Sequence, residues 1–277
     1  AGQVDPTAPL TQTALLAHLR EMEEEDPLLS VRPEADGVSV GVMGAVQVEV
    51  LQGILAARFG DVVRMCPPHV LYKETVAAPA VGIGHYEPLR HYAEVWLKLE
   101  PGAPGSGISF AADCPPNSLD ENWQRLIRTH VFERAHPGVL TGSPLCDVRI
   151  RLIAGRAHLK HTEGGDFREA TCRAIRNALM QAENVLLEPV VRFELAMPNE
   201  ALARVTGELL RIGAQLDASE TDGGETTLTG RCTAAMFWDY PTRFAASTHG
   251  HGRIASRFDR YEPCKNQDDI VRQRGYD

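Results

Sequence analysis

Residues 158–167, HLKHTEGGDF, gather side chains that could do chemistry. His158 and His161 lie three residues apart, and Glu163 and Asp166 follow within one short loop. Imidazole and carboxylate groups are metal ligands. The free N–H groups at the start of a helix bind anions. The segment is therefore a candidate metal site, a candidate anion-binding loop, or a loop that contacts a larger partner.

The spacing disfavours the metal site. Structural zinc sites have four ligands, usually with cysteine, and catalytic sites have three ligands and an open position. After His158 and His161, the only further nearby ligands are Glu163 and Asp166, and no cysteine is close. The favoured interpretation is a solvent-facing or RNA-facing loop that leads into a helix at 167–183.

Two features of this loop suit the start of a helix. Asp166 is predicted to be the N-cap, because its carboxylate can accept from the first free N–H groups. Gly164 and Gly165 are predicted to let the backbone turn tightly. The pairs His85/His91 and His249/His251 are further candidate metal ligands. A small metal-dependent enzyme that uses such histidine pairs therefore stays open as an alternative function.

Common catalytic motifs are missing from the sequence. It contains no G-x-x-x-x-G-K-[ST], no G-x-G-x-x-G at a strand–helix junction, no H-E-x-x-H and no G-x-S-x-G. We therefore assign no catalytic, cofactor-binding or metal residue, and we predict that this chain is not an enzyme.

The composition is that of a globular protein with an uneven charge. Of 277 residues, 43% are hydrophobic, and the net charge is −9. The net charge argues against a protein that coats nucleic acid generally, because phosphate binding usually needs a basic face. Residues 1–60 carry nine acids and three arginines, so the negative charge is concentrated there and a local basic contact near the C-terminus stays open. The six scattered cysteines indicate reduced thiols, and no signal peptide is recognisable, so we expect a cytoplasmic protein.

The elements that must position these residues fall into three segments, 1–72, 73–187 and 188–277. The first reads α-β-β-α-β. It is one strand short of a β-α-β-β-α-β unit, which suggests that the chain is cut from something longer. Its second helix is predicted to bury the apolar residues Val46, Val50, Leu51, Ile54 and Leu55.

The other two segments are also α+β. The middle one has alternating strands, with Ala93, Val95, Leu97 and Leu99 on one side of the first and Val148, Ile150 and Leu152 on one side of the last. The third reads as a complete β-α-β-β-α-β unit of the ferredoxin-like type. The fold class is therefore α+β, with three consecutive small α/β domains.

The whole chain resembles the C-terminal half of an elongation factor G-type translational GTPase, domains III, IV and V. The residues that carry the resemblance are VGVMGAVQVEVLQGILAARFG (40–60), CPPHVLYKETV (66–76), LLEPVVRFELAMP (186–198) and THGHGRIASRFDRYEP (248–263). Ala45 stands where the family usually has glutamate, and His251 where arginine is common.

Within that superfamily the chain is similar to the ribosomal protection, tetracycline-resistance-like branch. The carriers are GIGHYEPLRHYAEVWLKLEP (82–101), LTGSPLCDVRIRL (140–152) and HTEGGDFREATCRAI (161–175). The segment before G-D-F-R is shorter here than is typical of that branch. A general translocation factor without drug protection therefore stays open as the alternative.

The resemblance implies a fold, a partner and a set of contact residues. Two ferredoxin-like domains would flank a ribosomal protein S5 domain 2-like domain IV. The loops 82–91 and 161–166 would contact RNA at the decoding centre of the small subunit, and domain V would contact large-subunit RNA. The implied ribosome-binding residues are His85, Tyr86, Glu87, Pro88, His91, His161, Thr162, Glu163, Gly164, Gly165, Asp166, Arg243, His249, His251 and Arg253.

The resemblance also implies what the parent protein needs. GTP and magnesium would bind an N-terminal GTPase domain outside this sequence, which would be an intramolecular partner. This chain itself would hold no cofactor, contact no membrane and be a monomer.

Overall fold

Alternating apolar residues form the strands that organise the middle of the chain. In the computed structural model, which describes residues 2–6, 11–34, 37–42, 44–60 and 62–274, β7 (Ala93–Pro101) and β9 (Val148–Ala157) pair antiparallel. Ala93, Val95, Leu97 and Leu99 are fully buried, as predicted, because side chains alternate between the two faces of a strand. The sheet order is β6-β7-β9-β8, with β6 at Ala80–Tyr86 and β8 at Ile108–Ala112.

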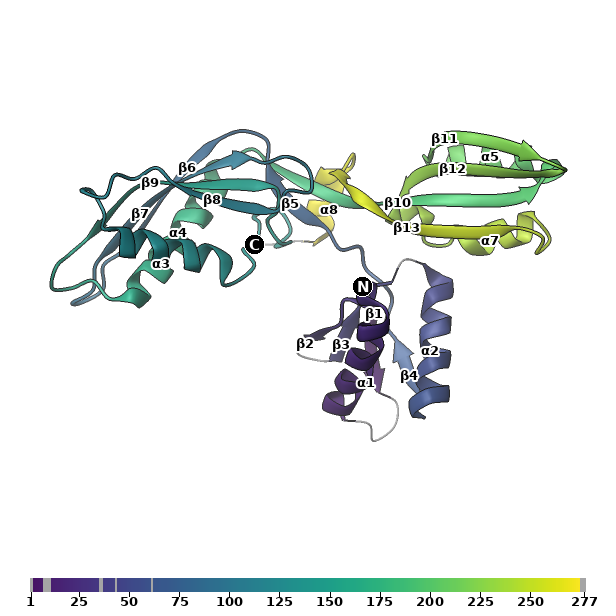
Figure 1. The fold of residues 1–277 in the computed structure, drawn as a ribbon, viewed down its shortest axis with the longest axis horizontal. Coiled ribbons are helices and arrows are strands. Elements are labelled where there is room, and N and C mark those ends of the chain that lie inside the picture. Colours follow the sequence, from purple (N-terminus) through teal and green to yellow (C-terminus); the bar gives the residue numbers. More distant parts are fainter. Residues whose placement is uncertain (1, 7–10, 35–36, 43, 61, 275–277) are drawn as a thin grey trace. The chain divides into compact units, whose positions relative to one another are not determined.

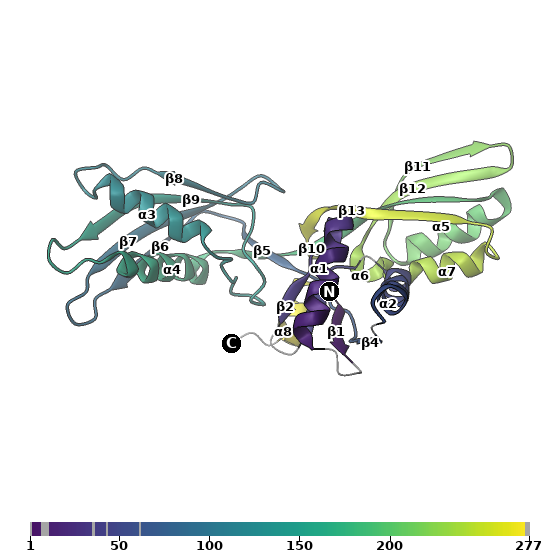
Figure 2. The ribbon, with the colours of Figure 1, turned by 60° about the horizontal axis from the view of Figure 1, so that its bottom comes forward.

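Two helices pack on one face of this sheet (Figures 1 and 2). They are α3 (Glu121–Phe132) and α4 (Gly164–Gln181), which contribute Ile127, Val131, Phe167, Ala170, Ala174 and Ile175 to the core. Residues 72–188 and 261–277 form one compact unit, which we call unit 2. It also contains β5 (Lys73–Val76), which pairs with Asn184–Leu187, and the C-terminal helix α8 (Gln267–Arg274).

The second compact unit, unit 1, holds residues 1–71 and 189–260. Its C-terminal part contains β10 (Asn184–Pro198), which begins in unit 2, then the 3-10 helix η2 (Asn199–Ala201) and α5 (Leu202–Arg211). The chain continues through β11 (Gln215–Asp222), β12 (Glu225–Thr233), α6 (Ala234–Phe237), α7 (Tyr240–Ser247) and β13 (Arg253–Pro263). The sheet order β11-β12-β10-β13 is that of the predicted ferredoxin-like domain.

The N-terminal part of unit 1 has the same topology. It comprises β1 (Gly2–Pro6), α1 (Gln12–Glu25), the 3-10 helix η1 (Pro27–Leu29), β2 (Arg32–Glu34), β3 (Gly37–Val40), α2 (Ala45–Phe59) and β4 (Val63–Met65). The order β2-β3-β1-β4 repeats that of the C-terminal sheet. The α+β class with consecutive small domains is confirmed.

The prediction that the first domain lacks its opening strand was wrong. β1 pairs antiparallel with β3 and with β4 and is a central strand of its sheet. The segment GQVDP has one aliphatic side chain and ends in proline, so alternation alone could not reveal it. Pairing with neighbours on both sides supplies the hydrogen bonds that define the strand.

The apolar face of α2 was also predicted incorrectly. Leu51 and Leu55 are buried, but Val46, Val50 and Ile54 are exposed, at 50%, 53% and 39% of their surface. Hydrophobicity runs around most of this helix, so its sequence did not say which side meets the sheet. Met43, within the resemblance at 40–60, lies outside the described residues.

Candidate functional site

The candidate site begins where β6 runs along α4. A Cβ atom on Gly84 would lie 1.7 Å from the carbonyl oxygen of Ala170, and one on Gly82 would lie 2.0 Å from that of Ala174. Only glycine permits this approach, which brings the end of β6 beside the first turns of α4. Residues 82–86 were predicted to be part of a loop, and this was wrong: they are strand, paired with β7.

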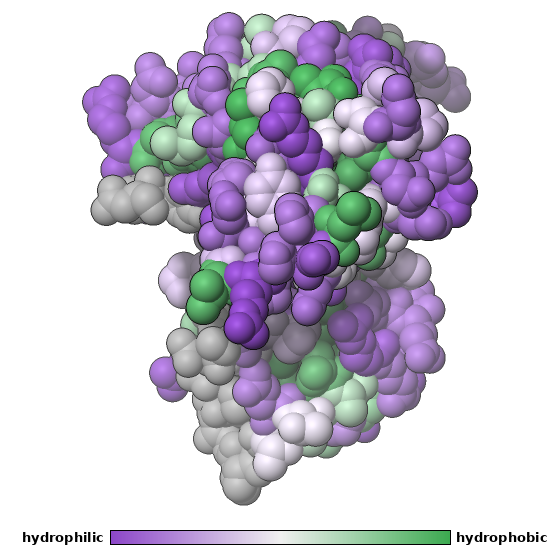
Figure 3. All heavy atoms as spheres, turned by 90° about the vertical axis from the view of Figure 1, so that its left-hand side faces the viewer, coloured by the Kyte–Doolittle hydropathy of each residue, from purple (hydrophilic) through white to green (hydrophobic). Residues whose placement is uncertain are grey.

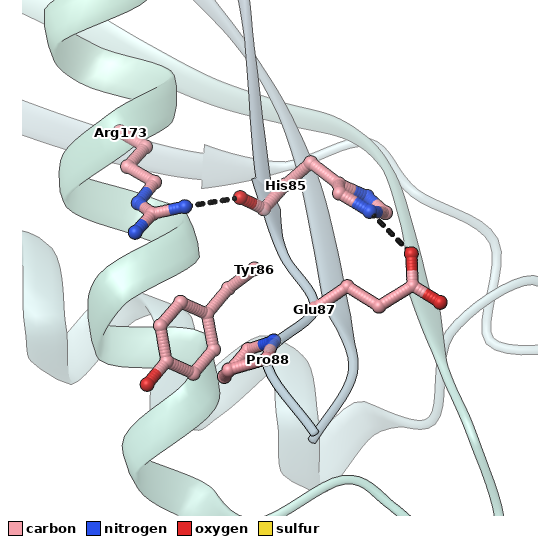
Figure 4. Close-up of a pocket in the computed structure, with 5 residues that line it drawn as sticks. All are labelled: His85, Tyr86, Glu87, Pro88 and Arg173. Atoms are coloured by element: carbon pink, nitrogen blue, oxygen red, sulfur yellow. Dashed lines mark hydrogen bonds and ion pairs between the residues drawn. The ribbon is translucent and has the colours of Figure 1, made fainter. Parts of the chain in front are cut away.

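At the end of β6, five residues line a pocket of about 410 Å³ (Figure 4). They are His85, Tyr86, Glu87, Pro88 and Arg173. The Arg173 guanidinium donates to the carbonyl oxygen of His85 at 2.9 Å and lies 5.1 Å from the centre of the Tyr86 ring. The His85 Nε2 and Glu87 Oε2 atoms are 2.8 Å apart. A cation, a phenol and an imidazole thus share one exposed surface.

The loop 158–163 is hydrogen-bonded to Tyr92, four residues after the pocket residue Pro88. The Tyr92 N–H donates to the carbonyl oxygen of His161 at 2.9 Å, and the Thr162 hydroxyl donates to the carbonyl oxygen of Tyr92 at 2.6 Å. His91 Nδ1 lies 2.8 Å from Asp166 Oδ1. We call the two loops, 86–92 and 158–163, the tip, since both lie at one end of unit 2 (Figures 1 and 2).

Asp166 has a different role from the predicted N-cap. The helix begins three residues earlier than predicted, at Gly164, and Glu163 is the N-cap. Asp166 is the third helical residue, and its Oδ2 accepts from the Glu163 N–H at 2.8 Å while Oδ1 faces His91. Gly164 and Gly165 are therefore the first two residues of the helix and do not form the predicted tight turn before it. The buried carboxylate fixes the helix start and a second loop together.

The two histidines of HLKHTEGGDF stack on each other. The ring centroids of His158 and His161 are 4.6 Å apart, with 22° between the planes. His158 Nδ1 accepts from the Lys160 N–H at 3.2 Å, so this ring nitrogen is occupied. Within the described parts of the chain, no three histidine, cysteine, aspartate or glutamate side chains converge in a way that could hold a metal ion.

Sequence reasoning missed two residues of the candidate site, Arg173 at the pocket and Tyr92 in the tip. Arg173 lies seven residues after Asp166, so two helical turns place both on the same side of α4, and this spacing could have identified it. Tyr92 was missed because a loop residue has no periodicity. Burial, and then the neighbouring Glu94 carboxylate, raise the pKa of Tyr92 above its usual value, which keeps the phenol neutral.

The candidate residues of the third segment form a separate surface in unit 1. Arg243 is exposed on α7, and His249 and His251 are exposed in the following loop, where His249 has a φ of 51°. Arg253 forms an ion pair with Glu225 at 2.9 Å, so one of the two predicted cations is neutralised. Glu225 was not among the candidates.

The surface around the tip is mixed in character. Figure 3, in which the left-hand side of Figure 1 faces the viewer, shows mostly hydrophilic residues with separate hydrophobic areas. Along the described ranges, no helix combines the length and apolarity that a membrane crossing requires. A polar surface with exposed rings and cations can contact bases and phosphates.

Family comparisons agree with this geometry. Residues 68–183 match the family model of elongation factor G, domain IV, and residues 185–270 match that of the elongation factor G C-terminus. The chain therefore contains a domain IV and a C-terminal domain of the elongation factor G family.

A solved structure shares the fold of the whole chain. A crystal structure of a protein from Thermus thermophilus superposes with a TM-score of 0.81 at 24% sequence identity. The similarity covers 100% of this chain and 42% of that one. The chain thus spans less than half the length of this structural relative, and at this identity the likeness concerns the fold alone.

Proposed function

We propose that this chain is the ribosome-binding C-terminal part of a longer translational GTPase related to the ribosomal protection branch. The tip of unit 2 contacts RNA at the decoding centre of the small subunit. The observation that carries this proposal is a domain IV whose two tip loops are hydrogen-bonded to each other, from the Tyr92 N–H to the carbonyl oxygen of His161. The centre of the Tyr92 ring lies 5.6 Å from that of His85, which lines the pocket together with Tyr86 and Arg173. Aromatic and imidazole rings stack on exposed bases, and arginine pairs with phosphate.

The proposal extends to the parent protein. Its domains would be 1–72, 73–187 and 188–277, with GTP and magnesium bound by an N-terminal domain outside this sequence. Arg243, His249 and His251 would contact large-subunit RNA, which their exposure supports. The parent would work as a cytoplasmic monomer.

A second candidate is a general elongation factor G-like protein without drug protection. The geometry of the second tip loop favours it. Six residues, 158–163, connect β9 to α4, and hydrogen bonds from Thr162 and to His161 hold them against Tyr92. A loop that is short and tethered has little reach beyond the tip. Translation by the full-length parent in the presence of tetracycline separates the two candidates: protection that is lost in His161→Ala supports the first.

Binding of the 277-residue chain to purified bacterial small ribosomal subunits tests the contact itself. We expect His161→Ala to weaken binding about tenfold, since stacking on one base contributes about 1–3 kcal/mol. Point substitutions are preferable to deletion of 161–165, which would remove the Glu163 N-cap and the first turn of α4.

Glu24→Lys is the matched control for this measurement. Glu24 is exposed on α1, away from the tip in sequence and in the other compact unit. We expect this reversal to leave the dissociation constant within about twofold of wild type. If wild-type chain and His161→Ala bind small subunits equally, or if neither binds, the proposed contact is wrong.

A further inference from the structure

The first tip loop contains a tight turn with a leucine and a cation at its centre. The His91 N–H donates to the carbonyl oxygen of Pro88 at 2.9 Å, which closes a four-residue turn. Leu89 and Arg90 are its two central residues. Arg90 has a φ of 65°, a left-handed conformation that non-glycine residues rarely adopt.

The second tip loop contains a four-residue turn closed by the equivalent hydrogen bond, although Lys160 does not share the left-handed conformation of Arg90. The His161 N–H donates to the carbonyl oxygen of His158 at 3.1 Å, and Leu159 and Lys160 are the central residues. Both turns therefore present leucine, then a cation, then a histidine whose N–H closes the turn. The two sequences, PLRH and HLKH, come from different parts of the chain and share the same order of chemistry.

The two leucines are unusually exposed. Leu89 exposes 90% of its surface and Leu159 exposes 107%. Among the described residues, no other large hydrophobic side chain reaches these values; the next, Met180, exposes 65%. Single exposed leucines are ordinary on protein surfaces. Two of them at the apices of adjacent turns form a repeated feature.

The turns are held together before any partner arrives. The Tyr92 N–H donates to the carbonyl oxygen of His161, and His91 Nδ1 lies 2.8 Å from the buried Asp166 carboxylate. A partner would therefore meet a preformed pair of apices, which lowers the entropic cost of binding. Arg90 and Lys160 are both exposed, and no ion pair to either is found among the described residues, so both cations are available to an anionic ligand.

We propose that Leu89 and Leu159 are twin apolar wedges that insert between bases of structured RNA, while Arg90 and Lys160 contact the adjoining phosphates. Apolar side chains enter base steps in this way in other nucleic-acid complexes, where cations next to them bind the backbone. This inference rests on the proposed ribosome contact. It adds the kind of RNA element that the tip would bind, namely two adjacent bases that can separate to admit a leucine side chain.

Two observations favour RNA over a lipid surface. The stacked rings of His158 and His161 offer a flat face on which a base can stack, whereas a lipid headgroup has no flat ring to stack on it. The two leucine side chains would also insert fewer carbons into a membrane than one myristoyl chain does, and one myristoyl chain by itself gives only marginal membrane binding.

The test measures binding of the 277-residue chain to purified small ribosomal subunits at several salt concentrations. We expect Leu89→Ala and Leu159→Ala each to raise the dissociation constant about fivefold, with an unchanged salt dependence, because no charge is removed. Leu159→Phe, which keeps a large apolar side chain, should retain wild-type binding. Met180→Ala, on exposed α4 surface, is the matched control and should bind like wild type.

The cations have a different signature in the same experiment. Arg90→Gln and Lys160→Gln should each reduce the slope of the logarithm of affinity against the logarithm of salt concentration by about 0.7–1. Wild-type binding by both leucine variants, alongside weak binding by His161→Ala, would overturn the wedges and leave the proposed function standing. If the wild-type chain does not bind small subunits, both fail. Leucine-dependent binding to phosphatidylcholine–phosphatidylserine vesicles would also overturn the proposal.

Discussion

Glu74 shows how one side chain can organise a loop of unit 2. It is fully buried, and its carboxylate accepts from the N–H groups of Leu140, Thr141 and Ser143 at 2.8–3.1 Å and from the Thr141 hydroxyl at 3.0 Å. A Cβ atom on Gly138 would lie 2.0 Å from Glu74 Oε2. The segment 138–143 thus folds around the Glu74 carboxylate, whose oxygen atoms accept hydrogen bonds from backbone N–H groups of this segment.

Replacing Glu74 should therefore destabilise unit 2. Glu74→Ala leaves several buried donors without an acceptor, and we expect a loss of about 2–4 kcal/mol in the free energy of unfolding. Glu74→Gln should lose less, since one carbonyl oxygen remains. Urea unfolding in a Trp238→Phe background follows unit 2 alone, because Trp96 and Trp123 are then the remaining tryptophans. An effect no larger than that of the exposed control Glu169→Ala would contradict this account.

Cys146 gives a prediction about pH. Burial, and then the Asp147 charge, raise the pKa of this thiol from 9.0 to about 11. The folded protein therefore holds the proton longer than the unfolded chain does. Its contribution to stability is constant below pH 9 and is lost as pH rises from 9 through 11, with a slope of up to about 1.4 kcal/mol per pH unit.

The matching experiment compares wild type with Cys146→Ala from pH 7 to 11 in the same tryptophan background. Wild type should lose stability above pH 9 more steeply than the variant. Parallel curves across this range would show that the thiol does not contribute, whatever offset the lost packing produces.

At the scale of the element, α2 illustrates a helix whose buried side is decided by its neighbours. Leu51 and Leu55 face the core of the N-terminal domain, together with Leu15 and Leu19 of α1. Val46, Val50 and Ile54 recur every four residues on an exposed side of the helix. The buried leucines therefore stabilise the fold far more than the exposed valine and isoleucine side chains do, because stabilisation follows the apolar area removed from water.

Substitutions on the two sides of α2 should differ sharply. Leu55→Ala should cost about 2–4 kcal/mol, because it removes a buried side chain and leaves a cavity. Val50→Thr should change stability by no more than about 0.5 kcal/mol. Hydrogen exchange of the α2 amides, read by mass spectrometry, provides the measurement. Equal loss of protection in the two variants would show that the valine side is covered.

At the scale of the whole molecule, the C-terminal residues belong with the middle of the chain. The Cys264 N–H donates to the carbonyl oxygen of Leu186 at 2.8 Å, and the Gln267 side chain accepts from the Leu186 N–H at 2.6 Å. The Arg274 guanidinium lies 4.7 Å from the centre of the Tyr72 ring. Unit 2 therefore consists of two chain segments, one that starts at Tyr72 and one that follows β13 at the C-terminal end.

Removing residues 264–277 should therefore destabilise unit 2 more than unit 1. We expect the midpoint of urea unfolding to fall for Trp96 and Trp123 in the Trp238→Phe background. It should stay nearly unchanged for Trp238 in a Trp96→Phe/Trp123→Phe background. Asp269→Ala, which alters only an exposed ion pair of α8 with Arg272, is the control. A larger shift for Trp238 would assign the segment to the other unit.

The sequence by itself determined the class of fold and the approximate place of the site. Residues such as Leu97 and Ile150 alternate with polar neighbours, and this period fixes which face of a strand is buried whatever surrounds it. Local chemistry likewise indicated a helix start after the second tip loop, although its boundary was off by several residues. Such features depend on neighbours in sequence.

Only the tertiary structure decided the features that depend on distant residues. β1 is a strand because β3 and β4 pair with it, and α2 buries Leu51 in place of Val50 because of where the sheet lies. Asp166 reaches His91, seventy-five residues away in sequence, and the PLRH and HLKH turns become neighbours through Tyr92 and His161. Long-range contacts of this kind leave no periodic pattern in the sequence, because the folded chain brings the residues together and their spacing along the sequence does not.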